Sequence, residues 1–153
     1  MNDLGVVHEE MACDPALADT AQFCEAYGVP LAKSANTILV ASRKPEGKIV
    51  ACLVLATTRL DVNGVVRRRM QVKKASFANA DQTREETGME IGGVTAFGLP
   101  ASIPIWVDSR VLDCDWIVIG AGSRSAKIRL DPQQLIGLNG FEVVEDLAQP
   151  PSP

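Results

Sequence analysis

The sequence is poor in the residues on which many hydrolases and metalloproteins depend. Its 153 residues include one histidine, His8, and the four cysteines show no Cys-x-x-Cys spacing. Structural zinc sites need clustered Cys and His ligands, and Ser-His or Cys-His catalysis needs a well-placed histidine. We therefore expect no metal and no cofactor, a structural role for His8, and buried free thiols at the cysteines.

Long apolar segments are missing as well. The longest apolar run, 49–57, is much shorter than the roughly 20 residues that a membrane-spanning helix needs. The first residues also lack the basic and then apolar pattern of a signal peptide. Hydrophobic residues make up 46% of the chain and charged residues 22%, as in ordinary globular domains. We therefore expect a soluble, cytoplasmic protein with no membrane partner.

The charge of the chain is unevenly distributed. The net charge of −4 argues against general nucleic-acid binding, yet five of the eight residues over 67–74 are basic. Arg124, Lys127 and Arg129 form a second basic cluster. Local basic patches on an acidic protein can hold a phosphate backbone. The alternative is a solvated helix face that binds nothing.

The remaining pattern predicts short strands that alternate with helices. We expect strands over 6–11, 37–42, 49–57, 73–78, 103–108, 116–119, 126–130 and 141–145. Helices are expected to begin at Asp14 or at Asp19–Thr20, to span 61–70 and 79–87, and to follow Asp131 briefly. Hairpins mix with strand–helix–strand units. This order predicts an α/β (α+β) fold, a single domain with a mixed, curved sheet or partial barrel of about seven strands and three or four helices.

The sequence also makes more specific predictions for two of the strands and for the C-terminal segment. The strand over 49–57 is apolar almost throughout and should be central, covered on both faces. Pro104 lies early in the strand over 103–108, which indicates entry from a sheet edge. The domain should span 1–147, and the proline-rich segment 148–153 is expected to be a disordered tail.

The stretch from Gly88 to Pro100 combines four of the twelve glycines with apolar side chains that include Ile91, Val94, Phe97 and Leu99. Glycine costs roughly 0.5–1 kcal/mol inside a helix or strand, so this composition indicates a packed loop. Gly88 itself is expected to end the preceding helix. The other N–H groups could serve as donors to a ligand or a developing oxyanion. The alternative is a tight connection with no binding role.

Several segments, taken in order, resemble a known family. They are Asp14-Pro15, Ala35-Asn36-Thr37-Ile38-Leu39-Val40, Lys73-Lys74-Ala75-Ser76-Phe77, Gly92-Gly93-Val94-Thr95-Ala96-Phe97-Gly98-Leu99-Pro100 and Ile119-Gly120-Ala121-Gly122-Ser123-Arg124-Ser125. This set resembles the YbaK-like aminoacyl-tRNA deacylases, free-standing relatives of the editing domain in bacterial prolyl-tRNA synthetases. The resemblance covers about residues 12–145.

The resemblance implies a hydrolase that cleaves the ester between a mischarged amino acid and the terminal adenosine of tRNA. Such an ester is already activated, so positioning a water and holding the oxyanion would be enough. The implied catalytic set is Asn36, Thr95, Gly92 and Gly93. The residues expected to contact substrate or tRNA are Lys33, Arg69, Lys74, Gly98, Gly120, Gly122, Ser123 and Arg124.

Two positions depart from the family pattern. Many members carry a functional lysine where this chain has Asn36, and an amide cannot supply positive charge. Lys33 or Lys74 is a candidate replacement. Ala96 stands where the family usually has proline. These departures leave a second interpretation open, a non-catalytic module that binds tRNA or a synthetase.

The expected partner is the acceptor end of tRNA. The sequence leaves open which amino acid is removed, whether an aminoacyl-tRNA synthetase also binds, and whether the chain is a monomer or a homodimer.

Overall fold

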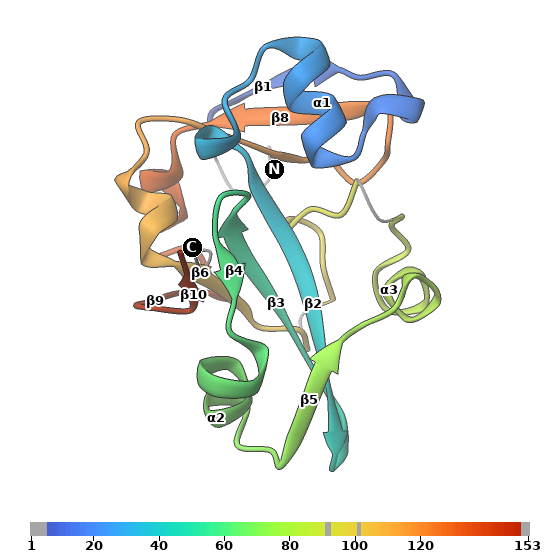
Figure 1. The fold of residues 1–153 in the computed structure, drawn as a ribbon, viewed down its shortest axis with the longest axis vertical. Coiled ribbons are helices and arrows are strands. Elements are labelled where there is room, and N and C mark those ends of the chain that lie inside the picture. The colour runs from blue at the N-terminus through green and yellow to red at the C-terminus, as the bar shows by residue number, and fades with distance from the viewer. Residues whose placement is uncertain (1–5, 91–92, 101, 151–153) are drawn as a thin grey trace.

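The computed structural model describes residues 6–90, 93–100 and 102–150 (Figure 1). Its helices are α1 (Thr20–Tyr27), α2 (Arg67–Met70) and α3 (Ala80–Thr87). Its strands are β1 (His8–Ala12), β2 (Ala35–Lys44), β3 (Glu46–Leu55), β4 (Arg59–Leu60), β5 (Lys74–Phe77), β6 (Ile105–Asp108), β7 (Ile117–Gly120), β8 (Ala126–Leu130), β9 (Phe141–Val144) and β10 (Ala148–Gln149). None of the described helices is long and apolar enough to cross a membrane.

The strands form three sheets rather than the single sheet that the sequence predicts. The largest has the order β5-β2-β3-β6-β9, antiparallel from β5 to β3 and parallel from β3 to β9. The antiparallel sheet β1-β8-β7 and the pair β10-β4 complete the fold. A single parallel bridge between Ser34 and Val118 connects β7 to the start of β2. The predicted α+β single domain with mixed strand pairing is confirmed, and its strands are divided over these three sheets.

The hairpin β2–β3 lies at the centre of the molecule (Figure 1). Residues 50–55 of β3 are all buried, as the apolar pattern predicts. Ala51, Leu53 and Leu55 pack into one core, whereas Cys52 and Val54 pack into a second core on the opposite face. Fully burying one such aliphatic side chain stabilises the fold by roughly 1.5–3 kcal/mol. The alternation of strand side chains thus divides the interior into two layers.

A third, smaller core joins α1 to the sheet of β1, β7 and β8. Phe23 and Cys24 of α1 pack there with Val118 of β7. The helix begins after Asp19, the second of the two predicted starts, and Gly28 ends it with a φ of 71°. Asp14 instead caps a short 3-10 helix at Pro15–Leu17. This packing holds the start of α1 beside the start of β2.

The caps of α3 agree with their prediction. The Asn79 side chain accepts a hydrogen bond from the Gln82 N–H, and Gly88 ends the helix with a φ of 73°. Gly88 therefore serves the helix, not the loop that follows.

All four cysteines are free thiols, three of them buried.

Two local predictions need correction. The strand β6 lies between β3 and β9, not at an edge, because Pro104 precedes the strand and accepts a hydrogen bond from Ala51 through its carbonyl. The predicted disordered segment 148–153 is wrong at its start. Ala148 is fully buried, and β10 pairs with β4 through Leu60 and Arg59. Apolar packing of Ala148 against the second core orders this part of the chain.

Candidate functional site

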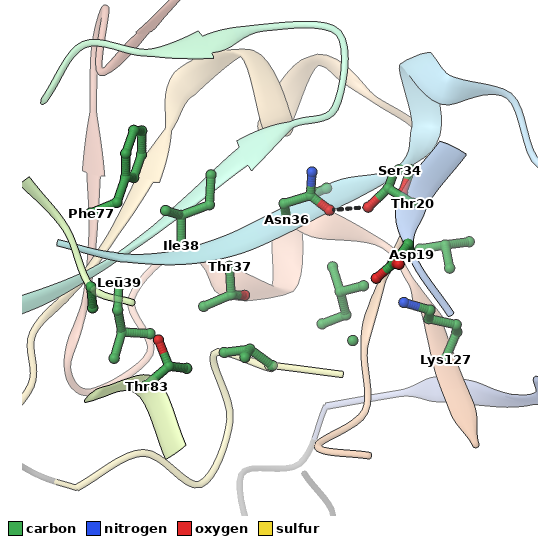
Figure 2. Close-up of a pocket in the computed structure, with 16 residues that line it drawn as sticks. Asp19, Thr20, Ser34, Asn36, Thr37, Ile38, Leu39, Phe77, Thr83 and Lys127 are labelled. Carbon is green, nitrogen blue, oxygen red and sulfur yellow. Dashed lines mark hydrogen bonds between the residues drawn. The ribbon is translucent and has the colours of Figure 1, made fainter. Parts of the chain in front are cut away.

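A pocket of about 370 Å³ opens along the first half of β2 (Figure 2). One end is formed by the start of α1 and by β7 and β8, and the other by the end of β5 and by α3. Its lining residues are Asp19, Thr20, Ser34, Ala35, Asn36, Thr37, Ile38, Leu39, Phe77, Ala78, Thr83, Val94, Val118, Ile119, Gly120 and Lys127. The pocket thus contains the strand segment that the family resemblance singled out.

The pocket exists because one edge of β2 is unpaired there. The Leu39 carbonyl accepts a hydrogen bond from the Ala78 N–H, so the backbone of Leu39 faces β5. The N–H and C=O groups of a strand residue point to the same edge as those of the residue two positions away. The backbone groups of Thr37 therefore point to the same edge of β2 as those of Leu39. However, among the described residues β5 pairs from Val40 onward, and the β-bridge to β7 lies at Ser34. Thr37 therefore lies in a gap between two neighbouring strands.

The side chain of Thr37 is also without a partner. Its hydroxyl is buried, and no group in the described part of the chain hydrogen-bonds to it. Leaving a buried polar group unsatisfied costs about 1–3 kcal/mol. Such groups are uncommon in folded proteins and call for an explanation, such as a water or a ligand. Thr37 thus offers a hydroxyl and an outward-facing backbone at one point of the pocket wall.

Asn36 lies next to Thr37 and points to the other face of the strand (Figure 2). Its Oδ1 accepts a hydrogen bond of 2.7 Å from the Thr20 hydroxyl, which comes from the first residue of α1. This bond fixes the amide and directs its two N–H donors away from Thr20. Within the residues described, these donors have no other hydrogen-bond partner.

Charged groups gather at the end of the pocket formed by α1 and β8. Lys127 is only 7% exposed, and its ammonium lies 5.4 Å from the centre of the Phe23 ring. Burial lowers the pKa of Lys127, whereas the nearby Asp19 raises it. Arg124 donates a hydrogen bond of 3.1 Å to the Asp19 carboxylate. Figure 2 shows the amine of Lys127 directed toward Asp19.

The two glycine-rich loops contact each other through their backbones. A Cβ on Gly120 would lie 2.2 Å from the Val94 carbonyl oxygen, and one on Gly93 would lie 2.4 Å from the backbone of Ser123. Real Cβ atoms do not approach other atoms this closely, so glycine is required at both positions. These two glycines allow the loops to pack, and Gly120 forms part of the pocket wall.

This packing corrects the prediction that the loop amides are open donors. The Gly93 N–H donates to the Glu90 carbonyl, and the Gly122 N–H donates to the Gly93 carbonyl at 2.7 Å. Both amides are used inside the protein, so neither is available to an oxyanion in this arrangement. Gly92, the remaining member of the predicted cradle, lies outside the described residues.

Comparisons with known proteins identify the family. The model of the aminoacyl-tRNA editing domain matches residues 14–138. Uncharacterized protein YwhH of Bacillus subtilis (strain 168) is 30% identical over 118 residues, which are 77% of this chain and 73% of YwhH. The chain belongs to the aminoacyl-tRNA editing domain family. The family resemblance of the sequence is therefore confirmed.

Solved structures show the same fold at lower identity. The editing domain superposes on hypothetical protein APE2540 with a TM-score of 0.85 and 22% identity, covering 97% of this chain and 95% of that one. A protein described as a candidate trans-editing enzyme for prolyl tRNA synthetase gives a TM-score of 0.77 at 21% identity. The match covers 93% of this chain and 86% of that one.

The loop residues of the predicted site lie outside this editing-domain pocket. Thr95 is buried, and its hydroxyl accepts a hydrogen bond of 3.4 Å from the Phe97 N–H. Gly98 is exposed with a φ of 77°, and Gly122 has a φ of 98°. Ser123 is exposed and hydrogen-bonds through its hydroxyl to that of Ser125. Of the predicted glycines that the structure describes, Gly120 alone lines the pocket.

Most of the predicted basic residues are also remote from the pocket lining. Lys33 forms an ion pair with Asp115 and lines a different cavity. Arg69 forms an ion pair with Glu142 and lies over the Trp106 ring. Lys74 is exposed on β5 and does not line this pocket. Neither Lys33 nor Lys74 therefore supplies a charge in the pocket at the place of the family lysine.

The structure adds lining residues that the sequence argument missed. Asp19 and Thr20 were assigned only to a helix cap, and Lys127 only to a basic cluster. No signal in the sequence marked Lys127, because it alternates with apolar residues in the same way as the exposed Arg129 on the same short strand. Tertiary contacts between α1, β2 and β8 bring the three residues together.

Proposed function

We propose that this editing domain is an aminoacyl-tRNA deacylase that acts on mischarged tRNA in trans. The observation that carries the proposal is the gap along β2, where Asn36 and Thr37 present polar groups without protein partners among the described residues. The gap is also part of the chain segment that matches the editing-domain family. A hydrolase acting on an activated ester needs positioned donors and acceptors more than it needs a strong base.

The open edge of β2 suits a substrate that carries both an ester and a ribose. The terminal adenosine enters between the two ends of the pocket, and the ester lies beside Thr37. The Thr37 hydroxyl accepts a hydrogen bond from the attacking water, and the outward N–H of Thr37 donates to the carbonyl oxygen. The Asn36 amide donates to a ribose oxygen. These roles use groups that the fold leaves unpaired on one short segment.

The reaction is a simple hydrolysis. The water oxygen forms a bond to the ester carbon, and the bond between that carbon and the ribose oxygen then breaks. The ribose oxygen takes up a proton from the water, which releases a free amino acid and an intact tRNA. A neighbouring ribose hydroxyl can relay this proton, so the site needs no histidine.

The walls of the pocket favour a small amino-acid side chain. Leu39, Val94 and Ile119 give an apolar surface beside Thr37. A pocket of about 370 Å³ has little room for a large side chain once the adenosine is bound. We therefore assign alanine, serine or threonine as the class of amino acid removed. An apolar pocket discriminates only modestly between such small groups.

Exposed groups near the pocket suit the single-stranded end of an RNA. Phe77 lines the pocket and is 53% exposed, so its ring can stack on a base. Lys74 lies on the same strand, and Arg124 lies on the other side beside Asp19. We assign phosphate contacts to these two cations.

The test is a deacylation assay on a panel of mischarged tRNAs. The purified protein should accelerate loss of the ester from at least one tRNA charged with alanine, serine or threonine. Esters of large amino acids should be lost at the uncatalysed rate. If no member of the panel is hydrolysed faster than in buffer, the proposal is wrong.

The alternative function is a non-catalytic module that binds tRNA or a synthetase. The observation in its favour is Asn36, which stands where many family members carry a lysine. Replacing Asn36→Ala separates the two functions. A catalytic pocket predicts lower turnover with RNA binding nearly unchanged, whereas a binding module predicts no turnover in either protein.

A further inference from the structure

The pocket contains a cation that comes from a strand far from the family lysine position. Lys127 is carried by β8, about ninety residues after Asn36 in the chain, yet both side chains line the same pocket. The structure describes no other lysine or arginine among the lining residues. The positive charge that is missing at position 36 on β2 is therefore present in the same pocket at Lys127 on β8.

Burial strengthens the electrostatic interactions of the Lys127 ammonium. Lys127 is 7% exposed, and its ammonium lies 5.4 Å from the centre of the Phe23 ring. Coulomb interactions are several times stronger in such surroundings than in bulk water. A preorganised cation aimed at developing negative charge can therefore stabilise a transition state strongly.

The charges around Lys127 are arranged to hold its side chain. Asp19 lies on the pocket side of α1 and attracts the ammonium, while Arg124 hydrogen-bonds to the same carboxylate. The negative charge of Asp19 is thus shared between two cations. The amides of Gly93 and Gly122 are used inside the protein, and Lys127 is the cation found among the described lining residues.

We propose that Lys127 is a catalytic residue whose ammonium binds the ester carbonyl oxygen and takes over the charge that a lysine at position 36 supplies in relatives. The ammonium keeps its protons throughout, and its contribution is to stabilise the oxyanion of the tetrahedral intermediate. This inference rests on the deacylase function proposed above. It also explains how a chain with Asn36 can keep the activity.

The test of this inference moves the positive charge from position 127 to position 36, where the family resemblance places a lysine. Lys127→Met removes the ammonium and keeps the apolar stem, and it should lower kcat on the best mischarged tRNA roughly 100-fold with little change in KM. The double variant Lys127→Met with Asn36→Lys should recover kcat to within about tenfold of the wild type. Arg129→Met, on the same strand but outside the pocket, is the matched control and should keep full activity.

Three outcomes would overturn the inference. They are a kcat of Lys127→Met within threefold of the wild type, an effect confined to KM, and failure of the added lysine to restore kcat. Thermal unfolding of each variant checks that the fold is intact, and Lys127→Gln replaces Lys127→Met if that variant does not fold. The inference is supported only if the loss of kcat in Lys127→Met and its recovery in the double variant both occur in folded protein.

A binding measurement separates this inference from the proposed function. An adenosine ester of the phosphonate analogue of alanine carries negative oxygens like those of the tetrahedral intermediate and is not hydrolysed. Its affinity should fall five- to tenfold in Lys127→Met and recover in the double variant, even if no tRNA is turned over. Equal affinity in all proteins would refute the role of Lys127 while leaving the deacylase proposal to its own assay.

Discussion

The two halves of β2 belong to one continuous strand and have very different surroundings. Residues 40–44 pair with β3 on one side and β5 on the other. There the Ser42 hydroxyl accepts from the Lys48 N–H, and Arg43 donates to the Ser76 hydroxyl. Residues 35–39 also pair with β3, but their other edge is open at Thr37, whose hydroxyl has no partner in the described structure.

This difference shows that the pocket is made by the ends of neighbouring strands. β5 stops at Phe77, and the β-bridge to β7 lies at Ser34, just before β2. The strand between these points keeps its geometry because β3 and the two cores hold it. A polar group there can face a ligand without loss of the surrounding fold. The rigid paired half supports the open half.

The largest effect is expected where the loops close the end of the open half. Gly120→Ala would place a Cβ 2.2 Å from the Val94 carbonyl oxygen, so one of the two loops must move. We expect a loss of more than about 3 kcal/mol in the free energy of unfolding. Urea unfolding followed by circular dichroism measures it.

Gly88→Ala is the matched control for this prediction. Its Cβ would meet nothing within 4 Å, and the cost comes from a φ of 73°. A residue with a Cβ pays roughly 1–2 kcal/mol in this conformation. Equal losses for the two variants would contradict the importance of the loop contact.

The next effect concerns the open half itself. Thr37→Val keeps the shape of the side chain and removes the unpartnered hydroxyl. We expect deacylation to fall roughly 100-fold, equivalent to about 2.7 kcal/mol in the barrier. Stability should stay the same or rise, because an unsatisfied buried group is removed. Single-turnover assays and thermal unfolding give the two values.

The paired half should respond in the opposite way. Ser42→Ala removes the acceptor of the Lys48 N–H. We expect the free energy of unfolding to fall by about 1 kcal/mol, with deacylation unchanged. If Ser42→Ala lowers activity as much as Thr37→Val does, the contrast between the two halves does not hold.

The smallest effect is expected at Lys33, just before β2. Lys33 pairs with Asp115 at the surface and lines a cavity different from that of Asn36. Exposed ion pairs contribute little because water and salt screen them. Lys33→Ala should therefore leave both the deacylation rate and the midpoint of thermal unfolding unchanged. A drop in kcat would show that Lys33 reaches the substrate after all.

Much of the local structure could be predicted from the sequence, because its signals act over a few residues. Asn79 and Gly88 were identified as the caps of α3 by side-chain type and spacing, and the structure contains both caps. The apolar run of β3 predicted a central strand, which is confirmed. The segment containing Asn36, which the family resemblance singled out, lines the pocket, and its catalytic role stays a prediction.

The predictions that failed depend on distant contacts. Gly93 and Gly120 are glycines because two loops meet, a contact between segments almost thirty residues apart. Ala148 was assigned to a tail because prolines follow it, yet burial against the second core orders it. Neither contact can be predicted from the composition of the local segment.

The sequence by itself determined the family and the element types, and it indicated β2 as the strand of the proposed site, since periodicity, caps and ordered motifs are local properties. Only the tertiary structure decided which edge of that strand stays open and which charge faces it. β5 ends before Thr37, and β8 brings Lys127 to the opposite wall. The physical reason is that unpaired backbone and buried charge are consequences of which neighbours pack together, and packing joins residues that are far apart in the chain.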